Sequence, residues 1–166
     1  MEEKRDARGL TESEAIARYR SRNYPKPALT ADIIVVHPDT EGTKVLLVER
    51  GGHPFIGKLA LPGGFANENE PVEETAAREL EEETGFSAAK WTHLTDLATT
   101  PGFCSEVISL YLAQDLTAGE VHPDEDEFLN VVKMPIAEVK NLIMRGEIAD
   151  SKTIAAILMA CNILGI

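Results

Sequence analysis

The stretch from Pro62 to Phe86, PGGFANENEPVEETAARELEEETGF, constrains this chain more than any other. Proline suits the start of a helix and glycine suits the residue just after its end, so the sequence predicts a short helix from Pro71 to Gly85. Glu79, Glu82 and Glu83 stand at i, i+3 and i+4 and therefore share one face of that helix. Carboxylates placed so close repel one another, which indicates either a well-solvated face or a bound cation. Oxygen ligands at this density suit Mg²⁺ or Mn²⁺ rather than zinc.

An apolar stripe runs beside these glutamates on the same predicted helix. Its members are Val72, Ala76, Ala77 and Leu80. An amphipathic helix packs its apolar stripe against a core. We therefore expect this stripe to fix the helix to the body of the protein.

The spacing of the whole stretch decides between a solvated face and a cation site. Gly64, Glu70, Arg78, Glu79, Leu80, Glu82, Glu83, Gly85 and Phe86 occupy the specified positions, with five residues between the first two and seven before the arginine. This pattern resembles the Nudix box at every specified position. The resemblance implies that the three glutamates of the helix hold Mg²⁺ ions against a pyrophosphate.

The remaining box residues have supporting roles in this interpretation. The loop that ends in glycine can bring backbone close to a ligand, because glycine adopts conformations closed to other residues. The resemblance makes the carbonyl of Gly63 a metal ligand. Glu70 can cap the first helical turn and favour its positive end. Arg78 can pair with Glu82 or Glu74, and so orient carboxylates without touching the substrate.

Composition limits the partners and the location of the protein. At 166 residues the chain is most simply an N-terminal segment, residues 1–22, followed by one domain, residues 23–166. A net charge of −12 makes nucleic acids poor partners. No apolar run reaches about 18 residues and the N-terminus is charged rather than signal-like, so we expect no membrane span and a cytoplasmic location. Cys104 and Cys161 lie far apart without a CxxC, which disfavours a disulfide framework or a zinc site.

Periodicity predicts an α+β domain. We expect residues 1–9 to be frayed, and Thr11 followed by Glu14 predicts a capping box at the start of a short helix. Strands are predicted at residues 28–36 and 43–50, which form a hairpin, and at 58–61, 91–99, 107–112 and 130–134. Two helices are predicted to close the chain, one from Pro135 to Arg145-Gly146 and an apolar one, capped by Asp150 or Ser151, to Leu164. The Nudix resemblance implies that these elements form an α/β/α sandwich with a mixed β-sheet.

Residues outside the box are candidates for binding the substrate. Arg50 ends a predicted strand near the box loop, where it is either a surface arginine or a contact to a phosphate or base. Pro101 comes fifteen residues after Phe86 and is followed by Gly102 and Glu106. This spacing is similar to the signature of the ADP-ribose pyrophosphatase branch, which implies that this loop contacts the substrate.

The base that activates water is expected outside the box, because the box glutamates are engaged with metal. The resemblance points to two glutamates separated by one residue on a loop, with Glu125 as the base and Glu127 as a further metal ligand. The neighbouring Asp124 and Asp126 leave this assignment open. His122 is the remaining candidate base.

Together, these features predict Mg²⁺-dependent hydrolysis of a nucleoside diphosphate linked to another moiety, with Glu82 and Glu125 as catalytic residues. The resemblance favours ADP-ribose, which gives AMP and ribose 5-phosphate. Nucleoside triphosphates, dinucleotides and other nucleotide sugars are alternative substrates, and a sensor that binds ADP-ribose without hydrolysis is an alternative function. Relatives are often homodimers in which the N-terminal segment reaches the partner's site, so we expect a homodimer and assign that contact to residues 1–30.

Overall fold

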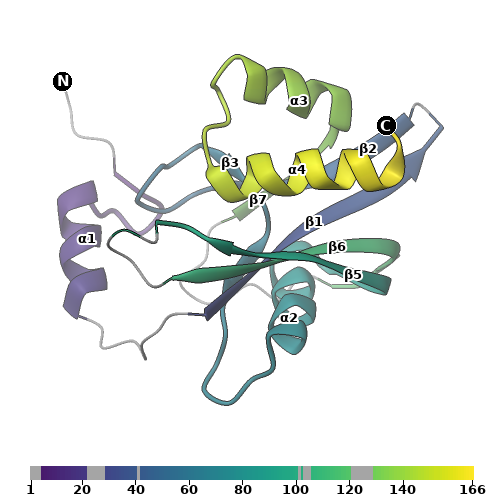
Figure 1. Cartoon of the computed structure of the whole chain (residues 1–166). Helices are drawn as coiled ribbons and strands as arrows, with labels where there is room; N and C mark the ends of the chain where they lie inside the picture. The colour runs from purple at the N-terminus through teal and green to yellow at the C-terminus, as the bar shows by residue number, and fades with distance from the viewer. Residues whose placement is uncertain (1–4, 22–28, 41, 101, 103–105, 121–128) are drawn as a thin grey trace.

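A single mixed sheet forms the centre of the molecule (Figure 1). The structure is a computed structural model, and it describes residues 5–21, 29–40, 42–100, 102, 106–120 and 129–166. The strands are β1 (Leu29–Asp39), β2 (Gly42–Arg50), β3 (Leu59–Ala60), β4 (Gly63–Phe65), β5 (Phe86–Ala98), β6 (Val107–Ala118) and β7 (Leu129–Pro135). The helices are α1 (Glu12–Ser21), α2 (Val72–Thr84), α3 (Ile136–Met144) and α4 (Ser151–Leu164).

Strand β1 lies in the middle of this sheet. The main path runs β3-β2-β1-β6-β5, while β4 pairs with β1 and β7 pairs with β2. Strands β1 and β6 are parallel, and the other pairings are antiparallel. The expected mixed sheet of an α+β fold is therefore confirmed.

Helices cover both faces of the sheet, and the alternation of β1 explains how. Successive residues of a strand point to opposite faces. Ile33 of β1 packs in one buried cluster with Leu80 of α2, whereas Ile34 packs in the other with Val139 of α3 and Ile157 of α4. Figure 1 shows α2 on one side of the sheet and α3 and α4 on the other. The α/β/α sandwich that the Nudix resemblance implies is thus confirmed.

The N-terminal half follows the predictions except at its start. The predicted hairpin forms, with Asp39 paired to Gly42 at its turn. The capping box of α1 also forms, because Thr11 N donates to Glu14 Oε2 at 2.8 Å and Glu14 N donates to Thr11 Oγ1 at 3.3 Å. The expectation that residues 1–9 are frayed is wrong for the described part of the segment. Asp6 is buried there and accepts hydrogen bonds from two backbone N–H groups of the following turn.

The predicted strands after the box are shorter than those observed. Gly85 ends α2 in a left-handed conformation, with φ at 70°, and donates its N–H to the carbonyl of Glu81. Strand β5 then begins at once, at Phe86 rather than at Trp91. Strand β6 continues past Leu112 to Ala118 because it pairs with β5 along this length. Cross-strand pairing therefore extends both strands beyond the segments that their own periodicity predicts.

The two C-terminal helices form as expected, with their ends now defined. Pro135 precedes α3 as its N-cap residue, and Asp150 rather than Ser151 caps α4 by accepting a hydrogen bond from Thr153 N at 3.0 Å. Helix α4 buries one face in the core, including Cys161, while Leu158 on another face is 53% exposed. Across the described residues, no helix combines the length and apolar character needed to cross a membrane.

Candidate active site

Helix α2 buries two of its three box glutamates. Glu79 and Glu83 are each only 5% exposed, whereas Glu82 is half-buried. The predicted apolar stripe is correct for Ala76 and Leu80, which are fully buried, but wrong for Ala77, which is exposed. The buried face of α2 therefore includes Glu79 and Glu83. Their carboxylates lie against the protein rather than on a solvated face.

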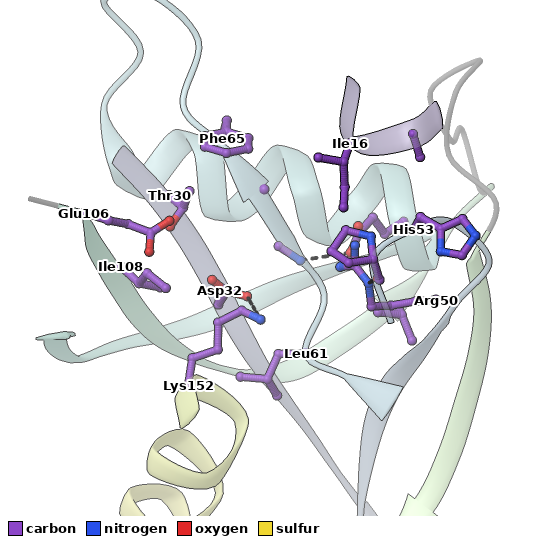
Figure 2. A pocket seen from close by; sticks show the side chains of 16 residues that line it. Ile16, Thr30, Asp32, Arg50, His53, Leu61, Phe65, Glu106, Ile108 and Lys152 are labelled. Carbon is purple, nitrogen blue, oxygen red and sulfur yellow. Dashed lines mark hydrogen bonds and ion pairs between the residues drawn. The ribbon is translucent and has the colours of Figure 1, made fainter. Parts of the chain in front are cut away.

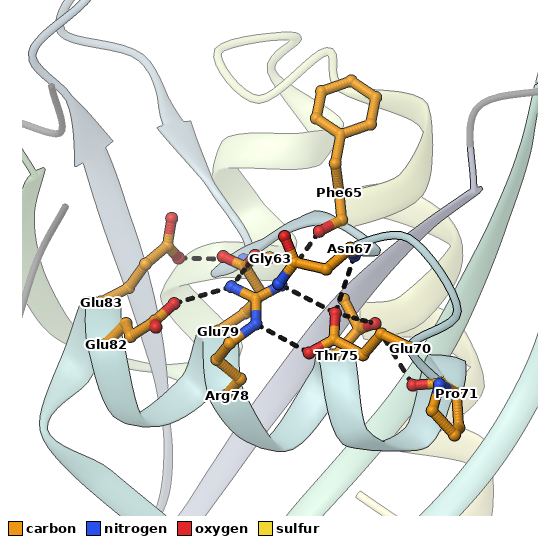
Figure 3. A network of polar contacts seen from close by, with 10 residues as sticks. All are labelled: Gly63, Phe65, Asn67, Glu70, Pro71, Thr75, Arg78, Glu79, Glu82 and Glu83. Atoms are coloured by element: carbon orange, nitrogen blue, oxygen red, sulfur yellow. Dashed lines mark hydrogen bonds and ion pairs between the residues drawn. The ribbon is translucent and has the colours of Figure 1, made fainter. Parts of the chain in front are cut away.

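Arg78 ties the box together (Figure 3). Its Nη1 donates to Glu79 Oε1 at 2.8 Å and to Glu82 Oε2 at 2.7 Å, and its Nε donates to Glu70 Oε1 at 2.9 Å. Its Nη2 donates to the carbonyl of Phe65 at 3.0 Å, which fixes the box loop to the helix. Glu82 is one of the two partners expected for this arginine, and it is the one observed. Arg78 thus orients three box carboxylates at once, two of which belong to candidate metal ligands.

Glu70 has a different role from the helix cap that was expected. No side chain caps the first turn of α2, and Pro71 occupies the N-cap position. The Glu70 carboxylate instead accepts hydrogen bonds from the Thr75 hydroxyl at 2.9 Å and from Arg78. The Arg78 guanidinium lowers the pKa of Glu70 to about 2. The attraction of this cation, about two turns further along the chain, holds the carboxylate away from the N-terminal N–H groups.

The two glycines of the box loop allow close approaches that a side chain would prevent. A Cβ on Gly63, whose φ is 149°, would lie 2.2 Å from the carbonyl oxygen of Ala31 on β1. Gly63 N also donates to Glu83 Oε2 at 2.9 Å. A Cβ on Gly64 would lie 2.5 Å from Glu79 Oε1. The loop backbone therefore packs directly onto two of the box carboxylates.

These oxygen donors suit a hard divalent cation. Glu79, Glu82 and Glu83 supply carboxylates, and Gly63 adds a backbone carbonyl, which is the type of donor set that Mg²⁺ prefers. A carboxylate has about four lone-pair sites, so a hydrogen bond from Arg78 does not exclude a cation. In the described part of the chain, no three Asp, Glu, His or Cys side chains are already gathered as a metal cage. These oxygen donors therefore have the chemistry that a divalent cation requires. In this structure the carboxylates accept hydrogen bonds from protein groups.

A cavity of about 550 Å³ opens beside the box (Figure 2). Glu83 and the two loop glycines form one wall, and α1 contributes Ala15 and Ile16. Arg50 and Glu106, both predicted to contact the substrate, also line the cavity. The structure therefore brings these two residues to the box.

Among the other predicted substrate contacts, the described residue Gly102 does not line this cavity. Gly102 is exposed, and no atom lies within 4 Å of the position that a Cβ would take there. Several candidates lie outside the described residues, namely Pro101, Cys104, His122, Asp124, Glu125, Asp126 and Glu127. Their assignments stay predictions.

The sequence reasoning missed a buried ion pair in the cavity. Asp32 of β1 is 3% exposed, and its Oδ1 lies 3.5 Å from Nζ of Lys152 in the first turn of α4. Lys152 Nζ also lies 3.2 Å from Asp150 Oδ2. An aspartate inside the largely apolar strand segment LTADIIVV is a signal that could have singled out Asp32, though not its partner Lys152.

Burial governs the ionisation of this pair. Loss of solvent raises the pKa of Asp32 to about 7, although Lys152 acts in the opposite direction. Burial alone would lower the pKa of Lys152, but Asp32 and Asp150 together outweigh it and raise that pKa. The cavity thus holds a carboxylate that ionises near neutral pH beside a firmly charged ammonium.

Comparisons with known proteins agree with this geometry. A sequence profile of the NUDIX domain matches residues 26–157. The ADP-ribose pyrophosphatase of Bacillus subtilis (strain 168) is 36% identical over 134 residues, which cover 75% of this chain and 72% of that protein. The crystal structure of an ADP compounds hydrolase is similar with a TM-score of 0.72 and 25% identity, covering 96% of this chain and 81% of that chain.

A second solved structure contains a ligand. The NUDIX domain of Shewanella oneidensis NrtR, complexed with ADP ribose, is similar with a TM-score of 0.68 and 27% identity, covering 93% of this chain and 99% of that chain. The predicted resemblance to the Nudix box and to the ADP-ribose pyrophosphatase branch is confirmed by these matches. The chain belongs to the Nudix hydrolase family.

Proposed function

We propose that the protein is a divalent-cation-dependent pyrophosphohydrolase that cleaves ADP-ribose to AMP and ribose 5-phosphate. The observation that carries this proposal is the complete box, held by Arg78, at the wall of a cavity of about 550 Å³ that also contains Arg50 and Glu106. A volume of this order suits a ligand of nucleotide size. The named substrates of the relatives support the choice of ADP-ribose.

In the proposed reaction, water attacks one phosphorus of the diphosphate and the bond from that phosphorus to the bridging oxygen breaks. A bound divalent cation supplies charge neutralisation and lowers the pKa of a bound water. Glu79, Glu82 and Glu83 would hold it with the carbonyl of Gly63. Arg78 positions the first two of these carboxylates through its hydrogen bonds.

The remaining roles fall to residues outside the sequence of the box. Glu125 is our candidate for the base that takes the proton of the attacking water, and Glu127 for a further metal ligand. Arg50 would contact a phosphate or the base, because its guanidinium provides planar donors at the cavity wall. Glu106 would contact the substrate, together with Pro101 and Gly102 of the same loop.

A matched pair of variants on α2 tests the proposal. Glu82→Gln should lower kcat for ADP-ribose by at least about 100-fold, because a neutral amide binds a divalent cation poorly. Glu81→Gln, one residue earlier and exposed, is the control and should retain activity. Release of AMP would be followed with Mg²⁺, with Mn²⁺ and with EDTA, and the Tm of both variants should stay close to that of the wild type. Wild-type turnover in Glu82→Gln, or full activity in EDTA, would reject the proposal.

The NrtR neighbour favours one alternative, a domain that binds ADP-ribose without cleaving it. The intact box supports hydrolysis instead, because the acidic arc has no evident use in a simple sensor. Calorimetric binding of ADP-ribose in Mg²⁺, with no product after long incubation, would establish the sensor.

Our preference for Mg²⁺, a homodimer and a cytoplasmic location stays part of the proposal, and analytical ultracentrifugation would test the homodimer.

A further inference from the structure

The cavity has two chemically different sides. Figure 2 shows Glu106, Thr30, Asp32 and Lys152 toward one side and His53 and Arg50 toward the other. The first side is acidic and the second is cationic and aromatic. A ligand with two unlike ends, joined by a diphosphate at the box, matches this division.

The acidic side is built into the fold. Along β1, alternate residues share one face, and on the α4 face Val36 and Ile34 belong to the core. The next two residues of the same row, Asp32 and Thr30, line the cavity instead. The row changes from apolar to polar where the cavity begins, so a buried strand delivers these two side chains to it.

Two carboxylates and one ammonium line this side, namely those of Asp32, Glu106 and Lys152. Asp32 Oδ1 lies 3.5 Å from Lys152 Nζ, and Glu106 lines the same side of the cavity, whereas Asp150, 3.2 Å from the same ammonium, lies outside the cavity lining. Because the carboxylates outnumber the ammonium, a phosphate group would be repelled here. A hydroxyl group would be accepted, since it can donate to a carboxylate and accept from the ammonium.

Thr30 provides a separate observation. The residue is 7% exposed, and its hydroxyl has no hydrogen-bond partner among the described residues. Buried polar groups in native proteins are normally paired. A polar ligand on this side of the cavity supplies the kind of partner that the protein itself does not.

We propose that Asp32 and Lys152, with Thr30 and Glu106 beside them, form a subsite for the hydroxyl groups of a sugar attached to the diphosphate, and that this subsite selects a sugar against a third phosphate. The inference rests on the proposed function, because it identifies which end of ADP-ribose lies here. The terminal ribose binds at this subsite and the adenosine lies toward Arg50 and His53. Asp32 and Lys152 are then specificity-determining residues.

A truncated substrate tests this without any mutation. The methyl ester of ADP keeps the adenosine, the diphosphate and the first carbon of the leaving group, but it has no sugar hydroxyls. For the wild type, kcat/KM should be about 10- to 100-fold higher for ADP-ribose than for this ester, and ATP should also be a poorer substrate. Equal kcat/KM for ADP-ribose and the ester would overturn the subsite while leaving the proposed function intact. If neither compound is cleaved, the proposed function itself fails.

Two variants then assign the effect to named residues. Asp32→Asn and Lys152→Met should each lower kcat/KM for ADP-ribose about 10-fold or more, mainly through KM, and change it little for the ester. Lys90→Met, on the exposed part of β5, is the matched control and should change neither. Equal losses on both substrates would indicate a structural role and overturn the assignment, as would no loss on either. Thermal unfolding of each variant identifies one that does not fold, and the other variant then decides.

Discussion

Gly63 and Gly64 are neighbours, yet substitution should affect them in different ways. A methyl group on Gly63 meets backbone, the carbonyl of Ala31 at 2.2 Å, at a φ that L-residues rarely adopt. A methyl group on Gly64 meets the carboxylate of Glu79 at 2.5 Å, which is the end of a flexible side chain and can move. The first substitution therefore strains the fold, whereas the second displaces a candidate metal ligand.

The expected results separate stability from activity. Gly63→Ala should lower the free energy of unfolding by at least about 2 kcal/mol, or the Tm by about 4–8 °C. Gly64→Ala should leave the Tm within about 2 °C but lower kcat by about 10-fold or more, because the carboxylate is misplaced. Thermal unfolding and initial rates check both. A Gly64→Ala enzyme of normal activity would show that the position of Glu79 is unimportant.

The pair of Glu70 and Arg78 makes stability depend on pH. Arg78 holds the pKa of Glu70 at about 2, below its usual value of 4.5, so the folded state binds this proton less readily than the unfolded state. The stabilisation is therefore fully present above a pH of about 4.5 and is lost as the pH falls toward about 2. Glu70→Gln removes the charge while keeping an acceptor.

Urea unfolding measures this contribution. At neutral pH, Glu70→Gln should be less stable than the wild type by about 1 kcal/mol, since the lost hydrogen bonds are charge-assisted and largely shielded from solvent. The difference should shrink as the pH is lowered from about 5 to about 3. A difference that stays constant with pH would mean that the charge of Glu70 contributes nothing.

At the scale of the element, the N-terminus of α4 depends on one cap. Asp150 accepts from Thr153 N at 3.0 Å and also lies beside Lys152. Asp150→Ala should destabilise the protein by about 1 kcal/mol, which is typical for a lost N-cap, whereas Asp150→Asn retains a capping oxygen and should cost less. Thermal unfolding compares the two. Equal losses would indicate that the charge, rather than the cap, is the stabilising feature.

Elements defined by local signals could be predicted from the sequence. The capping box of α1, the end of α2 at Gly85 and the cap of α4 each depend on residues a few positions apart. The rotation of α2 could not be predicted in full, because the burial of Glu79 depends on the loop that packs over it, at Gly64. The length of β6 depends on its partner β5.

At the scale of the whole molecule, the box depends on local sequence signals, whereas the cavity depends on contacts between distant segments. The box lies within one continuous stretch, so its spacing alone identified the carboxylates and Arg78. The cavity joins α1, β1, the box loop and the start of α4. Asp32 and Lys152 are far apart in sequence and meet only through the packing of α4 on the sheet, and no local pattern indicates such a contact. The family could therefore be predicted from the sequence, whereas the pairing of Asp32 with Lys152 in the cavity could not.

The N-terminal segment lines the cavity but lies outside the two large buried apolar clusters. Ala15 and Ile16 of α1 line the cavity, and Ala7 N donates to the carbonyl of Gly51 at 3.4 Å. The buried apolar clusters of the described residues begin only at Ala31. The segment therefore lies over the site of its own chain in this structure, as an addition to a domain whose two large apolar clusters are complete without it.

Removal of residues 1–22 tests this arrangement and the domain boundary together. The truncated protein should keep a cooperative unfolding transition, with its Tm within a few degrees of the full chain, because neither large apolar cluster loses a residue. Its KM for ADP-ribose should rise several-fold, since the cavity loses an apolar wall and the substrate becomes more exposed to water.

Ile16→Ala should give a smaller change in the same direction, while Glu12→Ala, exposed on the same helix, is the control. Loss of folding would place the segment within the domain, and an unchanged KM would show that α1 does not contact the substrate.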